Sequence, residues 1–243
     1  PLQPLKRFDH NDGGHRLNMR AHNFPTSVRG TIYGVVLNDR GSVEAMGSAL
    51  GEAPYKAPPK APVMYIKPGN TLSASGAAVA LPKGAVQVEI GATVGLVIGA
   101  PASRLNTQNA LAAVQGCVVV ADLSLPHTSY YRPAIREKCF DGSCVFADAV
   151  TPLASIPNLA GLRVETFVNG KQAGQWSLDE LVRSAPELLQ DVTEFMTLSP
   201  GDVLLLGVKW QAPAAAPGDQ VAVAVPGVGR LEFSIESATG SAA

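Results

Sequence analysis

The clearest pattern of hydrophobic and polar positions lies at residues 85–99, AVQVEIGATVGLVIG, where apolar residues alternate with small or polar ones. Side chains of a strand point alternately to its two faces, so this pattern predicts a strand with one apolar and one small, polar face. The apolar face comprises Val86, Val88, Ile90, Ala92, Val94, Leu96 and Ile98; the other comprises Gln87, Glu89, Gly91, Thr93 and Gly95. The polar face is either solvated or the wall of a binding site, and its one carboxylate is Glu89.

The rest of the chain also favours strands. Further strands are predicted at 31–38, 63–67, 117–124, 162–170, 203–208, 220–225 and 230–236. The Asn169-Gly170 pair is typical of a hairpin turn. Helices are predicted at 42–50 with Ser42 as the N-cap, at 106–116 with Asn106 or Thr107 as the N-cap, and at 177–196 with an interruption at Pro186. Strands outnumber helices without regular β-α-β alternation, which indicates a strand-dominated α+β fold.

The chain length and the positions of its polar segments indicate one main domain. The 243 residues are ample for a sizeable core. Residues 1–29 are polar and read as an N-terminal arm, residues 30–236 as the folded domain, and residues 237–243 as a flexible tail. Three of the four histidines, His10, His15 and His22, lie in the arm, where they are either metal ligands or ordinary residues of a mobile segment.

Charge and hydropathy narrow the range of partners. The formal net charge is −1 and no basic stripe is present, which argues against nucleic acid and membrane surfaces. No apolar run approaches the roughly 20 residues that span a bilayer. We therefore expect a cytoplasmic protein. The three cysteines, Cys117, Cys139 and Cys144, lack the spacing of a zinc site and are expected to be free thiols.

Candidate chemistry is concentrated in the middle third of the chain. Asp122 lies near the end of a buried apolar strand, where a strand often presents a side chain to a site; the alternative is a turn aspartate. The segment 129–142, SYYRPAIREKCFDG, offers Arg132, Lys138 and Asp141 beside Tyr131. Guanidinium and ammonium groups both match carboxylates, so this segment either binds a dicarboxylate or is a solvated loop.

Several motifs in sequence order identify a family resemblance. YIKPGNTL, a strand ending LVIG, then YYRPAIREKCFDG, LRVETFVNG, EFMTLSPGDVLLLG and GVGRLEF together resemble the fumarylacetoacetate hydrolase superfamily over about residues 30–236. The resemblance implies a mixed β-roll or sandwich of the superfamily's C-terminal-domain type with a few peripheral helices. It is narrower for YKAPPKAPVMYIKPGNTL and DLSLPHTSYYRPAIREKCFDGSC, which are similar to the N-terminal half of the decarboxylase/isomerases of homoprotocatechuate (4-hydroxyphenylacetate) degradation.

This resemblance implies an activity. Such enzymes decarboxylate 5-carboxymethyl-2-oxo-hex-3-ene-1,7-dioate and isomerise the resulting 2-hydroxyhepta-2,4-diene-1,7-dioate to a 2-oxo-enoate. It also implies a small dicarboxylate or 2-oxo acid as substrate and a homo-oligomer or hetero-oligomer with a paralogous subunit. Catalytic candidates are Lys138, Asp141 and His127, and substrate-binding candidates are Arg132, Tyr131, Lys67 and Thr93.

The resemblance also implies a metal, and here the sequence departs from the family. Metal-dependent members hold Mg2+ or Mn2+ with two glutamates in the predicted strand and an aspartate after the next helix. Those positions correspond to Gly91, Thr93 and Asp122, so Asp122 alone remains as a metal ligand. Glu89 lies about 7 Å before position 91 along a strand and could substitute only through a bulge. Three interpretations follow: an enzyme, a structural subunit for a metal-competent paralogue, or a dicarboxylate-binding module, with or without a metal of its own.

Overall fold

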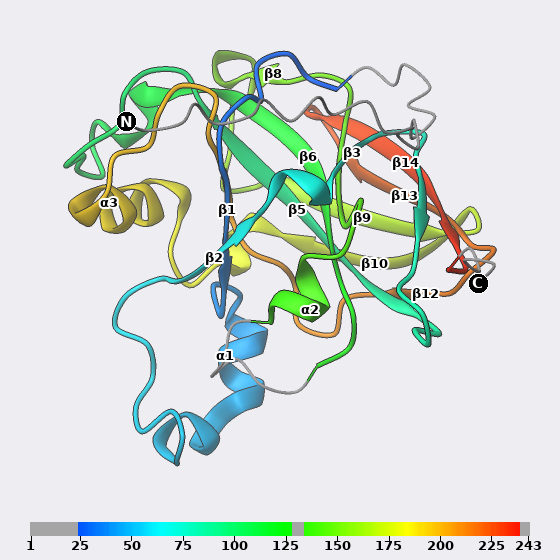
Figure 1. Cartoon of the computed structure of the whole chain (residues 1–243). Coiled ribbons are helices and arrows are strands. Elements are labelled where there is room, and N and C mark those ends of the chain that lie inside the picture. The colour runs from blue at the N-terminus through cyan, green and yellow to red at the C-terminus, as the bar shows by residue number, and fades with distance from the viewer. Residues whose placement is uncertain (1–23, 128–133, 239–243) are drawn as a thin grey trace, which may run out of the picture.

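The computed structural model describes residues 24–127 and 134–238. Two packed β-sheets form its body, with short helices around them (Figure 1). The larger sheet has the order β2-β1-β11-β5-β6-β7-β3, with β12 beside β5 and β8 beside β6. Its strands are β1 (Ile32–Val36), β2 (Val63–Lys67), β3 (Leu72–Ala74), β5 (Val88–Ile98), β6 (Val114–Ser124), β7 (Cys144–Phe146), β8 (Thr151–Pro152), β11 (Val203–Leu205) and β12 (Ala214–Ala215).

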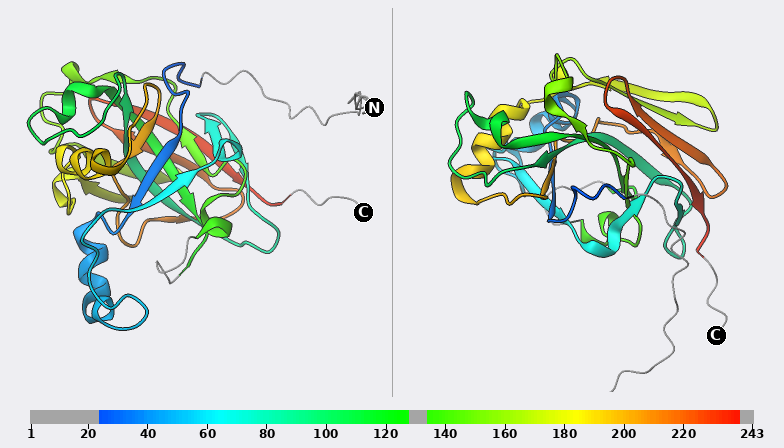
Figure 2. Two further views of the ribbon diagram at one scale, coloured as in Figure 1. Left: turned by 60° about the vertical axis from the view of Figure 1, so that its left-hand side comes forward. Right: turned by 90° about the horizontal axis from the view of Figure 1, so that it is seen from above.

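The smaller sheet covers one face of the larger one. Its order is β10-β9-β13-β14-β4, and its strands are β4 (Ala78–Ala80), β9 (Arg163–Val168), β10 (Lys171–Ser177), β13 (Gln220–Val225) and β14 (Gly229–Glu236). Seen from above, the two sheets form separate layers (Figure 2). The indole N–H of Trp176 in β10 donates to the carbonyl of Ala92 in β5 at 3.1 Å, a polar link between the layers. The predicted strand-dominated fold is confirmed.

Helices are few and peripheral. They are α1 (Arg40–Met46), α2 (Ile135–Lys138) and α3 (Ala185–Phe195), with 3-10 turns at η1 (Gly47–Gly51), η2 (Gly69–Thr71), η3 (Ala110–Ala113), η4 (Leu153–Ser155) and η5 (Leu178–Glu180). Figure 2 shows α1 and the segment after it projecting from the body. As predicted, the helical region around Pro186 is divided: η5 ends before it, and α3 begins with Pro186 in its first turn. Among the described residues, the helices are all too short to cross a membrane.

Two helix predictions were wrong in detail. The first helix is capped by Asp39, whose side chain accepts from the backbone N–H of Ser42 at 2.8 Å, so Ser42 lies inside the helix. The predicted helix at 106–116 is only the turn η3, and β6 already begins at Val114. Just before η3, the Asn109 and Asn106 side chains accept from the backbone N–H groups of Asn106 and Gln108, an alternative to helical hydrogen bonds.

The long strand β5 is buried on both faces along most of its length. The expected alternation therefore does not separate a solvated face from a core face, because residues 90–98 are all buried. The strand begins at Val88, and Val86, which the pattern places on the apolar face, is 76% exposed in the segment before the strand. The small residues on the other face leave room for neighbouring chain segments, which bring the polar groups described next against β5 and β6.

Candidate active site

The candidate site is built around Asp122, in the antiparallel pair formed by β5 and β6. Asp122 lies directly opposite Gly91 and is fully buried. Residues opposite one another in such a pair point to the same face. The Asp122 carboxylate consequently projects from the face that carries Gly91 and Thr93. The polar face of β5 thus borders a buried carboxylate.

Lys67, at the end of β2, is one of the two cations at this carboxylate. Its ammonium lies 2.9 Å from Asp122 Oδ1 as an ion pair and is fully buried. It also donates to the carbonyl of Lys138, to the carbonyl of Ser143 at 3.2 Å and to the hydroxyl of Ser143 at 3.0 Å. An ammonium has three N–H groups, so Lys67 is fully engaged within the protein and ties the 138–143 segment to β6.

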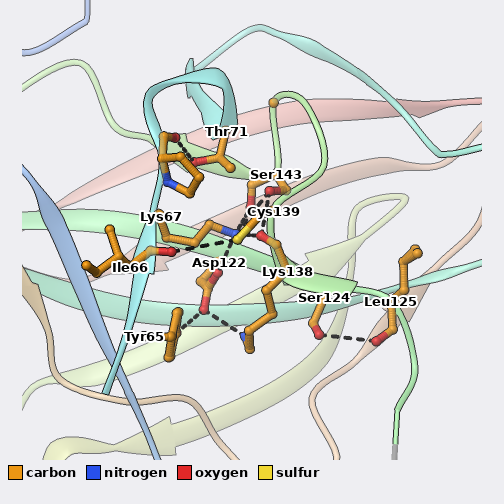
Figure 3. Close-up of polar contacts among 12 residues, drawn as sticks. Tyr65, Ile66, Lys67, Thr71, Asp122, Ser124, Leu125, Lys138, Cys139 and Ser143 are labelled. Carbon is orange, nitrogen blue, oxygen red and sulfur yellow. Dashed lines mark hydrogen bonds and ion pairs between the residues drawn. The ribbon is translucent and has the colours of Figure 1, made fainter. Parts of the chain in front are cut away.

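Lys138, at the end of α2, is the second cation. Its ammonium donates to Asp122 Oδ2 at 3.0 Å, and 7% of its side chain is exposed. The same oxygen accepts a hydrogen bond from the hydroxyl of Tyr65 in β2. The ammonium of Lys138 also lies 4.7 Å from the centre of the Tyr65 ring, within range of a cation–π interaction. Three elements distant in sequence, β2, β6 and α2, therefore converge on one carboxylate (Figure 3).

The electrostatics of the cluster fix its charge states. Burial raises the pKa of Asp122, but the ammonium groups of Lys138 and Lys67 outweigh it and hold this pKa at about 2. Burial and the Asp122 charge raise the pKa of Tyr65 well above its ordinary value, so Tyr65 stays a neutral donor. Two ammonium groups beside one carboxylate give the cluster one net positive charge.

The thiols near the site are neutral. Burial raises the pKa of Cys144 to about 12 and also raises that of Cys139, while the ammonium of Lys67 opposes both shifts. Burial likewise raises the pKa of Cys117, in β6, to about 12. All three cysteines are free, as predicted.

Gly91 and Thr93, the two positions at which the family resemblance implies metal-binding glutamates, are closed by neighbouring groups. A Cβ atom on Gly91 would lie 2.3 Å from the carbonyl oxygen of Asp122 and 2.9 Å from Cγ1 of Val208. The hydroxyl of Thr93 is fully buried and donates to the carbonyl of Gly207. The 207–208 segment thus fills the space beside β5 that longer acidic side chains would need.

These residues do not fit a divalent metal ion. Mg2+ and Mn2+ favour several oxygen ligands, with carboxylates prominent among them. Here each oxygen of Asp122 faces an ammonium group about 3 Å away, whose charge would repel a cation. No group of three His, Cys, Asp or Glu side chains suited to a metal ion occurs in residues 24–127 and 134–238.

The other predicted site residues lie apart from this cluster or outside the described chain. Glu89 is opposite Ser124, and the register shift of this strand pair falls between Val97 and Ile98, so no bulge brings Glu89 to position 91. Asp141 is exposed and accepts from the side chain of Asn70 at 2.7 Å. Tyr131 and Arg132 lie outside the described residues.

His127, the remaining catalytic candidate, lies three residues after Ser124. Its Nδ1 is 3.1 Å from the carbonyl of Leu125 and 3.3 Å from the hydroxyl of Ser124. Both contacts are with residues at or just after the C-terminal end of β6, Ser124 and Leu125, so they hold the imidazole close to the end of that strand.

Tyr65 is the member of the cluster that sequence reasoning missed. A signal was available: Tyr65 and Lys67 are two residues apart in a strand and so share a face. Gly34 lies opposite Tyr65 in β1, and a Cβ atom there would lie 2.2 Å from Cζ of the tyrosine. The glycine therefore makes room for the ring at the position from which its hydroxyl reaches Asp122.

Comparison with known proteins supports a common origin. Residues 31–236 match the family model described as fumarylacetoacetate (FAA) hydrolase C-terminal. The chain is 40% identical over 205 residues to the 4-hydroxyphenylacetate degradation bifunctional isomerase/decarboxylase of Salmonella dublin, covering 84% of this chain and 47% of that protein. The chain spans about half the length of these isomerase/decarboxylase relatives.

Solved structures share the fold. The 5-carboxymethyl-2-hydroxymuconate delta-isomerase of Mycobacterium smegmatis superposes with a TM-score of 0.75 at 22% identity, over 90% of this chain and 83% of that one. The fumarylpyruvate hydrolase of Pseudomonas aeruginosa, crystallised with Mn2+ and pyruvate, gives a TM-score of 0.73 at 21% identity, over 86% of this chain and 90% of that one. With most of its length matched by one family model, the chain belongs to the fumarylacetoacetate hydrolase family.

Proposed function

We propose that the chain is a subunit of an isomerase/decarboxylase that acts on 2-oxo and 2-hydroxy-dienoic dicarboxylates of 4-hydroxyphenylacetate degradation. The relative from Salmonella dublin supports the reaction class. The observation that carries the proposal is the buried Lys67–Asp122–Lys138 cluster with its one excess positive charge. The proposed substrates are 5-carboxymethyl-2-oxo-hex-3-ene-1,7-dioate and 2-hydroxyhepta-2,4-diene-1,7-dioate.

Both reactions pass through an enol or enolate. In the decarboxylation, the bond to the departing carboxylate breaks and its electron pair flows toward the carbonyl oxygen as CO2 leaves. In the isomerisation, the dienol hydroxyl loses a proton, a carbonyl forms, and a carbon at the far end of the diene gains a proton. Negative charge on the oxygen is common to both, and a fixed ammonium stabilises such charge. Lys138 is the proposed source of that ammonium, with His127 as the alternative proton carrier.

A second candidate is a metal-less structural or dicarboxylate-binding subunit that partners a metal-competent paralogue. It is favoured by the crowding at Gly91 and by the engagement of both Asp122 oxygens. The half-length match supports a second family domain beside this one, contributed by another copy, a paralogous chain or a further part of the same polypeptide. We expect either assembly in the cytoplasm.

One assay separates the two candidates. The purified chain is tested for decarboxylation and isomerisation with Mg2+, with EDTA, and with a metal-competent paralogue. Turnover by the lone chain supports the enzyme, whether or not EDTA affects it. Turnover only by the paralogue, increased when this chain is added, supports the structural subunit. The absence of turnover by this chain in every condition, with no effect on the paralogue, contradicts the proposed function.

A further inference from the structure

The buried cluster has one cation, Lys138, that the described part of the chain does not fully engage. Lys67 has four polar partners, whereas Lys138 has one hydrogen-bond acceptor, Asp122 Oδ2, among the described residues. Residues 24–127 and 134–238 therefore leave two of the three N–H groups of the Lys138 ammonium available to a ligand. Lys138 is also the one of the two lysines whose side chain reaches the surface.

The charge balance indicates what that ligand is. Two ammonium groups share one carboxylate, and the neighbouring thiols of Cys139 and Cys144 stay neutral because burial raises their pKa. The nearby carboxylate of Asp141 is exposed and bound to Asn70 instead. A buried charge without a counter-ion is costly, so an anion that reaches Lys138 is favoured.

Tyr65 holds this ammonium in place. Its hydroxyl occupies the same Asp122 oxygen as Lys138, and its ring lies beneath the ammonium at 4.7 Å. The ring in turn lies over Gly34, where any larger side chain would displace it. A flexible lysine side chain is thereby restricted to one orientation before a ligand arrives, which lowers the entropic cost of binding.

We propose that this chain has a metal-independent anion site, in which the Lys138 ammonium, positioned by Tyr65 and Asp122, binds a carboxylate or enolate oxygen. The ammonium supplies the positive charge for which related sites provide a divalent cation. The class of ligand, a 2-oxo acid or dicarboxylate, rests on the proposed function. Tyr65 is a positioning residue in this site, because it acts through Lys138.

The test is calorimetric titration with oxalate, a planar dicarboxylate that resembles the enolate of a 2-oxo acid. The full chain is titrated in EDTA and, separately, in Mn2+. We expect oxalate to bind in EDTA with an affinity that Mn2+ does not improve, and elemental analysis to find no stoichiometric metal after dialysis against Mn2+. Binding that appears only with Mn2+, or stoichiometric retention of Mn2+, would overturn the proposal.

Variants assign the site to its residues. Lys138→Met is expected to weaken oxalate at least about tenfold, as the loss of one charge-assisted hydrogen bond requires, and Lys138→Arg to retain part of the affinity. Tyr65→Phe keeps the ring and is expected to weaken oxalate less than Tyr65→Leu. The exposed Lys171→Met is the control for lost charge. Unchanged affinity in folded Lys138→Met, or an equal loss in Lys171→Met, contradicts the proposal.

This test is independent of turnover. Metal-free oxalate binding without catalysis would leave the anion site standing while the enzyme proposal fails. Catalysis that needs a metal, without metal-free oxalate binding, would leave the enzyme proposal standing while the anion site fails.

Discussion

At the residue scale, the site depends on how three side chains share one carboxylate. Asp122 and Lys138 could be predicted from the sequence, because one lies near the end of a buried strand and the other belongs to a family motif. The different numbers of hydrogen-bond partners of Lys67 and Lys138 could not be predicted. Lys67 was expected to bind substrate, but its contacts with Ser143 and with the Lys138 carbonyl depend on a fold that joins β2 to the 138–143 segment.

Replacing Asp122 tests this charge arrangement. Asp122→Asn leaves two buried ammonium groups without a counter-ion, and we expect it to lower the free energy of unfolding at pH 7 by about 3–5 kcal/mol. The exposed pair Arg230–Glu232 provides the control: Glu232→Gln is expected to cost at most about 1 kcal/mol. Equal losses in urea unfolding would show that the buried cluster has no special role.

The same variant has a predicted pH signature. The pKa of Asp122 is about 2 in the folded chain and 3.8 ordinarily, so its ionised form stabilises the fold above about pH 4. That contribution disappears as the pH falls from about 4 toward 2. Asp122→Asn should therefore unfold more easily at neutral pH but show a flatter loss of stability between these two values. A pH profile parallel to that of the wild type would contradict the assigned pKa.

Position 91 provides a test of the local crowding. In Gly91→Ala the new methyl group would press on the carbonyl of Asp122 and on Val208, and we expect a loss of about 1–3 kcal/mol in unfolding free energy. Gly51→Ala is the matched control, since nothing lies within 4 Å of a Cβ atom there. If both variants were equally stable, position 91 would be open to larger side chains.

At the scale of elements, strands were predicted better than helices. The apolar run at 117–124 and the Asn169-Gly170 turn led directly to β6 and to the β9–β10 hairpin, because period and turn chemistry are local signals. The predicted helix at 106–116 was wrong because Asn side chains accept from backbone N–H groups at its start and because Val114 pairs with Ile98 of another strand. Burial of both faces of β5 likewise depends on segments that the local pattern does not contain.

The hairpin turn yields a prediction at this scale. Gly170 has a positive φ of 75°, a conformation that costs other residues roughly 1 kcal/mol, so Gly170→Ala should destabilise the chain by about that amount. Gly69→Ala is the control, because it also has open space around its Cβ position but no positive φ. Chemical denaturation of both variants measures the difference, and equal stabilities would argue against this turn geometry.

At the scale of the whole molecule, the chain has the family fold and holds one aspartate between two lysines at its centre. Family motifs in the sequence were sufficient to predict the fold, and Gly91 and Thr93 were visible as departures from the glutamates that the resemblance implies. The surroundings of these positions could not be predicted from the sequence. In the structure, Gly207 and Val208 fill the space beside positions 91 and 93, and two lysines surround the remaining aspartate. We therefore propose that this domain stabilises negative charge with an ammonium group.

The measurement that tests this claim most directly is the kcat/KM for isomerisation of 2-hydroxyhepta-2,4-diene-1,7-dioate in the presence of EDTA. Wild type, Lys138→Arg and Lys138→Ala are compared, with circular dichroism to verify folding. We expect turnover by the wild type in EDTA, a fall of about 100- to 1000-fold in Lys138→Ala, and partial activity in Lys138→Arg. Turnover that EDTA abolishes, or a folded Lys138→Ala variant as active as the wild type, would contradict the account.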